Sequence, residues 1–163
     1  MPINKFNIET PIGELEIMTK SGAIILCEFS DRQKRITAHL AKHYNGDEIV
    51  NISAPAPIKT AFDMYFKGEL HALEKLPIAP LGSAHQLKAW KYLQTIPAGT
   101  TQSYGTMAKN IDSHARAVGS ANGRNAIALT VPCHRIIGAD GSLTGYAGGI
   151  ERKKWLLKHE GAI

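Results

Sequence analysis

Cysteine is scarce in this chain. The 163 residues include only Cys27 and Cys133, which makes a disulfide framework implausible as the basis of the fold. A chain of this length can bury a core without such cross-links, either as one domain or as two small ones. A reducing compartment suits a reactive thiol, and we expect the protein to be cytoplasmic.

Long apolar runs are also absent. No stretch approaches the length of a membrane span, and the N-terminus lacks the basic-then-apolar pattern of a secretory signal. Apolar residues make up 44% of the chain and charged residues 20%, which is ordinary for a soluble globular protein. The sequence therefore predicts no membrane partner.

Acidic residues are few in the second half of the chain. Residues 1–79 hold nine Lys/Arg and ten Asp/Glu, a net charge of −1, whereas residues 80–163 hold ten Lys/Arg and four Asp/Glu, a net charge of +6. An excess of this sign is what a DNA-binding half requires. Basic proteins are common, so charge alone gives only a weak preference for nucleic acid.

The first 79 residues begin with β-structure. Three short apolar runs, separated by turn-like Pro11-Ile12-Gly13 and Lys20-Ser21-Gly22, predict strands at Phe6–Thr10, Leu15–Thr19 and Ala23–Phe29. A helix is expected to follow.

That helix is predicted from Asp31 to about His43. Ser30 precedes it as the expected N-cap, and Ile36 and Leu40 fall on one face.

Proline and glycine mark the end of the first half. Pro55 and Pro57 introduce a second helix at about Ile58–Phe66, which Gly68 is expected to end. Its apolar residues Ala61, Phe62, Tyr65 and Phe66 are predicted to be core. The segment Glu74–Ala84 contains two further prolines and a glycine, and we interpret it as the linker between two domains.

Beyond the linker the pattern is helical. Ser83 is the expected cap of a helix through about Ile96, with Leu87, Trp90 and Leu93 facing inward.

Two shorter helices follow. One begins at Ser103–Ala108, and the other runs from His114 to about Asn122 with Asp112-Ser113 as its cap. Two short helices joined by a tight turn predict a helix-turn-helix.

The second of these helices is unusual for a DNA reader. Most of its residues are small, and Arg116 is its one long cation. Major-groove readers present several Arg, Asn or Gln side chains. Small residues instead allow the helix backbone to approach the duplex, which favours phosphate contact and the minor groove with little sequence preference. Composition alone does not exclude the alternative, in which the small residues merely allow tight helix packing.

The segment Val131-Pro132-Cys133-His134-Arg135-Ile136-Ile137 carries the chemistry. It places a thiol, an imidazole and a guanidinium in succession behind a proline, which restrains the backbone before the sulfur. A nearby histidine and a cation both favour the nucleophilic thiolate. A lone cysteine is usually a small buried hydrophobe, but these neighbours make Cys133 a candidate nucleophile.

The surrounding residues resemble a known family. Asn125 to Gly138, the run Gly145-Tyr146-Ala147-Gly148-Gly149 and the run Trp155-Leu156-Leu157-Lys158-His159-Glu160-Gly161 are similar to the O6-alkylguanine-DNA alkyltransferases. These are methylated-DNA–protein-cysteine methyltransferases, which repair alkylated bases. The match extends from about Leu87 to Gly161 and centres on the Pro-Cys-His-Arg signature.

The resemblance implies a reaction and its catalytic residues. Cys133 is the expected nucleophile, which takes the alkyl group from O6-alkylguanine, irreversibly and once per molecule; O4-alkylthymine stays open as a second substrate. His134 is the expected base. Adjacent residues on an extended segment point to opposite sides, so it is expected to reach the Cys133 thiol through a bridging water. Glu160 is expected to orient the histidine and favour its charged form, and Tyr104 to contact a phosphate and protonate guanine N3.

The resemblance also implies residues that contact DNA or the lesion. Arg116 takes the place of the extruded nucleotide, Asn125 braces the turn before the active-site segment, and Tyr146 forms an apolar wall. The remaining expected contacts are Arg135, the carbonyl of Ile136, the backbone of Ala147, and Gly148, which gives the loop room. Ala147 stands where some relatives have serine, so any hydroxyl contact to O6 is lost and the preferred alkyl group stays open.

The fold class implied is α+β, with a ribonuclease-H-like α/β domain at residues 1–79. A mainly helical, winged-helix-like domain with the helix-turn-helix follows at residues 80–163. The expected partner is double-stranded DNA containing alkylated bases, bound through the minor groove by a monomer, with no cofactor.

Some relatives hold a structural zinc ion in the N-terminal domain. Cys27 is the only cysteine in that half, and we expect it to be a core residue. His39 and His43 are four residues apart but lack a third ligand, so a solvated face is the preferred interpretation. No metal site is predicted.

Three other functions agree less well with the sequence. A non-enzymatic relative that binds alkylated DNA would have another residue at Cys133. A Cys-His-Glu hydrolase would need an oxyanion hole, and the basic half with its helix-turn-helix disfavours it. A transcriptional regulator is disfavoured because 163 residues leave no room for further regulatory domains.

Overall fold

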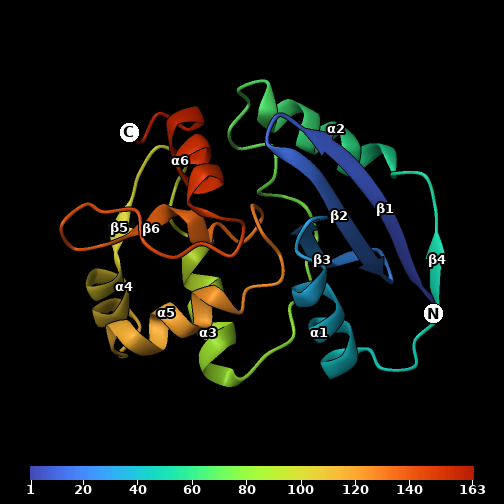
Figure 1. Cartoon of the computed structure of the whole chain (residues 1–163), viewed down its shortest axis with the longest axis horizontal. Coiled ribbons are helices and arrows are strands. Elements are labelled where there is room, and N and C mark those ends of the chain that lie inside the picture. Colours follow the sequence, from blue (N-terminus) through green and yellow to red (C-terminus); the bar gives the residue numbers. More distant parts are fainter. The chain divides into compact units, whose positions relative to one another are not determined.

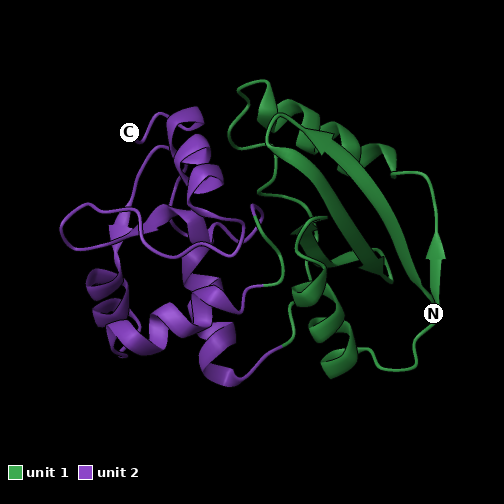
Figure 2. Ribbon diagram, in the orientation of Figure 1, with its two compact units in different colours: residues 1–81, 126–128 green, residues 82–125, 129–163 purple.

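The computed structural model describes residues 1–163 and divides them into two compact units. Unit 1 contains residues 1–81 and 126–128, and unit 2 contains residues 82–125 and 129–163 (Figure 2). No helix has both the length and the apolar character needed to cross a membrane.

Unit 1 is built on a four-stranded sheet of order β3-β2-β1-β4 (Figure 1). The strands are β1 (Ile3–Thr10), β2 (Gly13–Lys20), β3 (Ala23–Phe29) and β4 (Ile49–Asn51). β1, β2 and β3 form an antiparallel meander, and β4 pairs in parallel with β1. The three strands predicted from the sequence are confirmed.

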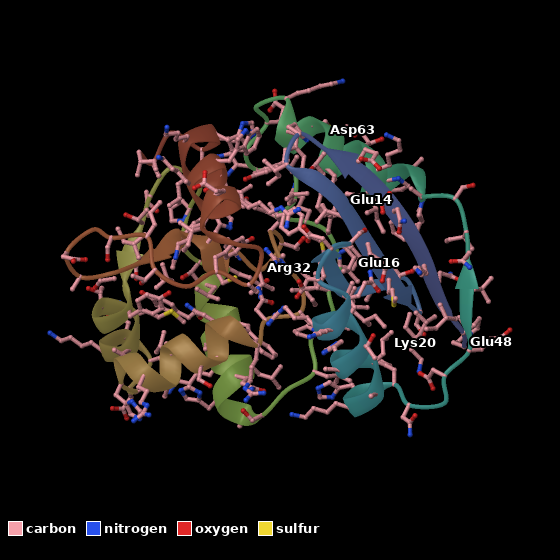
Figure 3. All side chains as sticks on the ribbon, viewed as in Figure 1. Glu14, Glu16, Lys20, Arg32, Glu48 and Asp63 are labelled. Carbon is pink, nitrogen blue, oxygen red and sulfur yellow. The ribbon has the colours of Figure 1, made fainter.

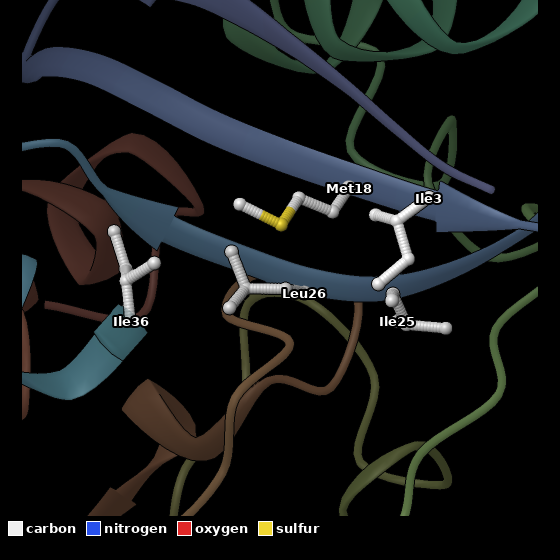
Figure 4. Packing of buried hydrophobic residues seen from close by; sticks show 5 residues of the cluster. All are labelled: Ile3, Met18, Ile25, Leu26 and Ile36. Atoms are coloured by element: carbon white, nitrogen blue, oxygen red, sulfur yellow. The ribbon is translucent and has the colours of Figure 1, made fainter. Parts of the chain in front are cut away.

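The two inner strands explain the position of the core. The central residues of β2 and nearly all of β3 are buried without alternation, as expected for strands covered on both faces. Close packing of Ile3, Met18, Ile25 and Leu26 with Ile36 of the first helix forms one apolar cluster (Figure 4).

Helix α1 (Gln33–His43) supplies Ile36 to this cluster, and Leu40 packs against it. The predicted cap was wrong: Arg32 is the N-cap and makes no side-chain cap bond. The Ser30 hydroxyl instead donates to the Glu14 carboxylate at 2.8 Å, so it is engaged by a neighbouring strand.

The two histidines of α1 are not on a fully solvated face. His39 and His43 are half-buried, and their ring centroids lie 4.9 Å apart. Burial, reinforced by the charge of His43, lowers the pKa of His39 to about 4, so this ring is neutral near neutral pH.

Helix α2 (Ala56–Phe66) begins two residues earlier than predicted, with Pro57 in its first turn, where the missing N–H has no helical partner to lose. It contacts β1. Of its predicted core residues, Ala61, Phe62 and Tyr65 are buried whereas Phe66 is half-buried.

Charged side chains also line the sheet of unit 1, and Figure 3 labels Glu14, Glu16 and Lys20 among them. Glu16 is buried and pairs with Lys5 at 3.3 Å, while Lys20 pairs with Asp47 at 2.7 Å. Such pairs contribute little to stability where they are exposed and keep the buried carboxylate satisfied.

Cys27 lies within β3 and is fully buried, which agrees with its predicted core role. Its backbone N–H donates to the Ala126 carbonyl at 2.8 Å, and the Ala128 N–H donates to the Cys27 carbonyl at 2.9 Å. The segment 126–128 therefore belongs to unit 1 although both flanking segments belong to unit 2.

Unit 2 is mainly helical. Its elements are α3 (Ala84–Leu93), β5 (Gln102–Ser103), α4 (Tyr104–Asn110), α5 (Ala115–Gly123), the 3₁₀ helix η1 (Cys133–Arg135), β6 (Ile136–Ile137) and α6 (Ile150–His159) (Figure 1).

Helix α3 starts as predicted, with Ser83 and Gln86 forming a capping box. It ends at Leu93, three residues before the predicted end. Trp90 and Leu93 are buried, but Leu87 is 39% exposed, which contradicts its predicted inward position. At 3.6 residues per turn Leu87 lies roughly a third of a turn away from the buried face.

Helices α4 and α5 pack against each other and form the predicted helix-turn-helix. The predicted cap of α5 was wrong, because His114 is the N-cap and its Nδ1 accepts from the Ala117 N–H at 3.3 Å. Asp112 instead adopts a left-handed φ of 55° in the turn, and Ser113 is engaged with His85 at 2.9 Å.

The short parallel pair β5 and β6 positions the candidate site. Gln102 faces Ile136 and Ser103 faces Ile137 in the register. β5 leads directly into α4, and β6 follows directly after η1. The pairing therefore brings Tyr104, the first residue of α4, beside the segment that begins at Cys133.

Candidate active site

A cavity of about 140 Å³ opens in unit 2 beside Cys133. It draws on α4, α5, η1 and the loop before α6. Its lining residues are Tyr104, Gly119, Asn122, Gly123, Cys133, Gly145, Tyr146 and Ala147. The volume is below that of a drug-sized site, and it suits one planar base better than a whole nucleotide.

Cys133 is the first residue of η1 and is 8% exposed. The buried Asn125 amide donates to the Val131 carbonyl at 2.9 Å and to the Cys133 sulfur at 3.4 Å. A donor at the sulfur favours the thiolate over the thiol. The amide thus ties the chain before the nucleophile and contacts the nucleophile itself.

The predicted extended geometry at Cys133 and His134 was wrong, because both lie in a 3₁₀ turn. His134 is fully buried, and its Nε2 lies 2.9 Å from Oε2 of Glu160. Glu160 is the C-cap of α6, where the sequence placed it. The structure therefore joins His134 and Glu160 by a hydrogen bond, directly after Cys133 in η1.

Burial lowers the pKa of His134 below its ordinary value, although the Glu160 hydrogen bond and charge raise it. Glu160 thus favours the charged imidazole, as expected, but burial outweighs it and the imidazole is neutral near neutral pH. Because Nε2 faces a carboxylate, we assign the proton to Nε2. Nδ1 is then an acceptor, and it is buried without a hydrogen-bond partner.

Arg135 was expected to contact DNA or the lesion, but its guanidinium is buried. Its Nε and Nη2 donate to the two Glu160 oxygens at 2.9 Å each, and Nη1 donates to the Ile96 carbonyl at 2.7 Å. Although burial raises the pKa of Glu160, the bonds from His134 and Arg135 lower it further, to a value below its usual range. Arg135 is therefore engaged in holding the Glu160 carboxylate.

Lys153 was missed by the sequence reasoning. It is fully buried, and its Nζ donates to the carbonyls of Ile136 at 2.5 Å, Thr144 at 3.1 Å and Gly145 at 3.4 Å. Burial lowers the pKa of Lys153 to about 8, against the charge of Cys133, which raises it. The ammonium fixes the loop that forms one side of the cavity.

A signal for Lys153 was present in the helix pattern. Lys153 precedes Leu156 and Leu157 by three and four residues, so all three fall on one helix face. Both leucines are fully buried. A lysine on an apolar face is a candidate for a buried, functional cation.

Tyr104 is partly buried, and its hydroxyl donates to the Thr144 carbonyl at 3.1 Å. Burial and the negative charge of Cys133 raise the pKa of Tyr104, while the bond to Thr144 lowers it less. The phenol is therefore protonated and faces the same cavity as the sulfur. It can act as a proton donor there.

The other predicted pocket residues surround this cavity or support it. Tyr146 and Ala147 line the cavity. The rings of Tyr146 and His134 are arranged edge to face, with their centroids 6.4 Å apart. The Ile136 carbonyl accepts from Lys153 and retains a second lone pair. Gly148 is buried, and its carbonyl accepts from Arg152 at 3.2 Å.

The small residues of α5 divide between two uses. Ala121 is buried, and its carbonyl accepts from Trp90 at 2.8 Å. A Cβ added at Gly119 or Gly123 would meet no protein atom within 4 Å, so packing inside unit 2 does not require glycine there. Arg116 is exposed three residues before Gly119, on the same helix face as the cavity.

Comparison with protein families matches both halves of the chain. Residues 6–80 match the ribonuclease-like domain of 6-O-methylguanine DNA methyltransferase, and residues 84–162 match its DNA-binding domain.

Individual relatives agree over nearly the whole length. A methylated-DNA–protein-cysteine methyltransferase of Shigella flexneri is 41% identical over 161 residues, covering 96% of this chain and 94% of the relative. The Haemophilus influenzae protein of that name is 36% identical over 93% of this chain and 82% of its own length.

Solved structures show the same fold. Mycobacterium tuberculosis OGT in complex with DNA superposes with a TM-score of 0.82 at 36% identity, covering 99% of this chain and 94% of that chain. The O6-methylguanine-DNA methyltransferase of Pyrococcus kodakaraensis superposes with a TM-score of 0.71 at 26% identity, covering 98% of this chain and 99% of that chain. The chain belongs to the 6-O-methylguanine DNA methyltransferase family.

Proposed function

We propose that this chain repairs DNA by transferring the alkyl group of O6-alkylguanine irreversibly to Cys133. Family membership supports DNA repair by alkyl transfer. The observation that carries the assignment to Cys133 is the cavity that combines this thiol, the protonated Tyr104 phenol and, behind the thiol, the His134–Glu160 pair.

The first step is removal of the thiol proton. Nδ1 of His134 accepts it through a bridging water, while Nε2–H stays bonded to Glu160. The Asn125 amide and the buried Lys153 ammonium favour the resulting sulfur charge.

The second step is displacement at carbon. The sulfur attacks the alkyl carbon, so an S–C bond forms while the C–O6 bond breaks and its electron pair stays on guanine. Tyr104 donates a proton to guanine N3, and the imidazolium of His134 returns the thiol proton through solvent, so the phenol is restored. The carbonyls of Ile136 and Cys133 accept from the guanine amino group, and the Ala147 N–H faces O6.

Access to O6 requires extrusion of the base from the duplex. Arg116 is exposed on α5 beside glycines whose outer side is open, and it takes the place of the extruded nucleotide. Residues 80–163 carry a net charge of +6, which supports binding to phosphates through the minor groove with little sequence preference. O4-alkylthymine is open as a second substrate.

The product predicts a single turnover. An S-alkyl cysteine is a thioether, which lacks the activated carbonyl that water attacks in an acyl-enzyme. Residues 1–79 are proposed as the ribonuclease-H-like domain and residues 80–163 as the DNA-binding and alkyl-transfer domain of a cytoplasmic monomer without a cofactor.

A restriction-site assay tests this function. A duplex whose cleavage site contains one O6-methylguanine resists the restriction enzyme until the methyl group is removed. We expect cleavable DNA to increase until it equals the amount of protein added and then to stop. Cys133→Ser should restore no site. Continued restoration beyond one equivalent would contradict the irreversible transfer.

A further inference from the structure

The lining of the cavity contains one amide that the reaction above does not use. Asn122 lies in α5 and is 7% exposed, so its side chain is more than nine-tenths buried. Neither its Oδ1 nor its Nδ2 has a hydrogen-bond partner. Buried polar side chains are normally hydrogen-bonded, and an exception in a cavity wall indicates a partner that binds there.

The position of Asn122 relates it to the reacting sulfur. The Asn125 N–H donates to the Asn122 carbonyl at 3.2 Å, so one helical turn joins the two residues. The Asn125 amide in turn lies 3.4 Å from the Cys133 sulfur, and Cys133 and Asn122 line the same cavity. The substituent on O6 must point at this sulfur, which places it on the Asn122 side of the cavity.

The other lining residues leave few hydrogen-bonding groups for that substituent. Three of them are glycines, one is Ala147 and one is Cys133 itself. The Tyr104 hydroxyl already donates to Thr144, so the Tyr146 hydroxyl is the other polar side-chain group beside Asn122 in this lining. An apolar wall would suffice for methyl and longer alkyl groups. The Asn122 amide supplies both a donor and an acceptor. An alkyl substituent cannot hydrogen-bond with either of them.

We propose that Asn122 is a specificity-determining residue that recognises O6 substituents with a polar end, such as 2-hydroxyethyl. The hydroxyl of such a group accepts from Nδ2 or donates to Oδ1 while its first carbon is placed for attack by the sulfur. The inference rests on the proposed alkyl transfer to Cys133 and names a substrate class for it. The bonds made and broken are those of the methyl reaction.

The test compares two substituents of equal length in single-turnover transfer. Duplexes carry O6-(2-hydroxyethyl)guanine or O6-propylguanine, which differ in a terminal hydroxyl or methyl group. For each protein, the rate of hydroxyethyl transfer is divided by the rate of propyl transfer. The measured quotient is this ratio in the wild type divided by the same ratio in Asn122→Leu. Intrinsic differences in leaving-carbon reactivity cancel in this quotient.

We expect the quotient to lie between about twofold and tenfold in favour of the hydroxyethyl group in the wild type, the value of one neutral hydrogen bond. A quotient of one would overturn the proposal. Equal slowing of both substrates by Asn122→Leu would also overturn it, because a purely structural role slows both alike.

Two controls keep the result interpretable. Thr130 also has a buried hydroxyl without a partner but does not line the cavity, so Thr130→Val should leave the rate ratio unchanged. Asn122→Met, an unbranched residue that favours helix, carries the same test should the leucine variant unfold. Transfer from O6-methylguanine by the wild type is measured alongside: its failure refutes the proposed function, whereas its success with a quotient of one refutes only the role of Asn122.

Discussion

Replacement of Glu160 by glutamine should separate the chemical role of the carboxylate from its structural one. The carboxylate accepts from His134 Nε2 and from Nε and Nη2 of Arg135, each at 2.9 Å, and all three side chains are buried. The glutamine amide would keep one acceptor oxygen but place an NH₂ group against the other donors. It would also leave the Arg135 charge buried without a counter-ion.

The expected loss of stability is large. Removing one partner of a buried ion pair costs about 3–5 kcal/mol. For a protein of this size, each kcal/mol shifts the melting temperature by about 2–4 °C, so Glu160→Gln should lower it by roughly 6–20 °C. Thermal unfolding followed by circular dichroism measures this shift.

The expected loss of rate has a different cause. Without the negative charge, the proton is held less firmly on Nε2. Where the glutamine NH₂ group faces Nε2, the proton moves to Nδ1, which then cannot accept the thiol proton. A positioned general base contributes about 10²- to 10⁴-fold, and we expect a loss in that range in single-turnover methyl transfer at about 10–15 °C, where the variant is folded.

Arg135→Lys is the matched control. It removes the two-pronged contact with Glu160 and the bond to Ile96 but keeps a positive charge beside the carboxylate and leaves the His134–Glu160 pair in place. It should lose stability and retain transfer within about tenfold of the wild-type rate. A folded Glu160→Gln protein that transfers at the Arg135→Lys rate would refute the role of the carboxylate in the chemistry.

Four further outcomes are expected. Lys153→Met should slow methyl transfer, since it removes the buried cation near Cys133. The pKa of Lys153 is lowered to about 8 in the folded protein, so the contribution of Lys153 to the unfolding free energy should increase from pH 8 to about 10.5. In chemical denaturation the difference in unfolding free energy between the wild type and Lys153→Met should therefore change in favour of the wild type over this range, and a constant difference would contradict the assignment. Asn125→Ala should lower the unfolding free energy by about 1–3 kcal/mol, measured by urea unfolding, and should slow single-turnover transfer. If both values stay unchanged, the Asn125 bonds to the Val131 carbonyl and the Cys133 sulfur contribute nothing to stability or rate. Arg116→Ala should slow transfer from a duplex but leave the transfer rate from a single-stranded oligonucleotide unchanged, because a single strand needs no extrusion. Equal slowing on both substrates in a gel-based rate assay would contradict the role of Arg116. The folded pKa values of His134 and Glu160 are both lowered. The unfolding free energy of the protein should therefore fall as the pH drops below the unfolded pKa values of the two groups, about 6.5 and 4.3. A constant unfolding free energy between pH 7 and pH 4 would contradict this.

The elements of this fold were largely predictable because local patterns specify them. Apolar runs between turns marked the three strands of the meander, and Ser83 marked the start of α3 as its N-cap. The wrong helix caps concern side chains with a second available partner. Ser30 was expected to cap α1, but Glu14 lies across the sheet from it, and a local pattern contains no information on such long-range competition.

The candidate site was predictable as far as motif positions extend. Cys133, His134 and Glu160 were all named from the sequence, and the structure joins the last two by a hydrogen bond. The role of Arg135 was not predictable, because a charged residue beside a nucleophile suggests DNA contact until its burial is known.

Lys153 and Asn122 were missed for a related reason. Lysine and asparagine are usually surface residues, and the position of Lys153 on the same helix face as Leu156 and Leu157 was the one local sign of its burial. Only the tertiary structure shows that the first donates to three carbonyls and that the second lines the cavity.

The most direct test of the central claim is the intact mass of the protein after incubation with excess duplex containing one O6-methylguanine. We expect one added methyl group per chain, located on Cys133 by peptide mapping, with no second addition on prolonged incubation. Tight, lesion-selective binding without a mass change would contradict the account, because the chain would then sense the lesion without removing it.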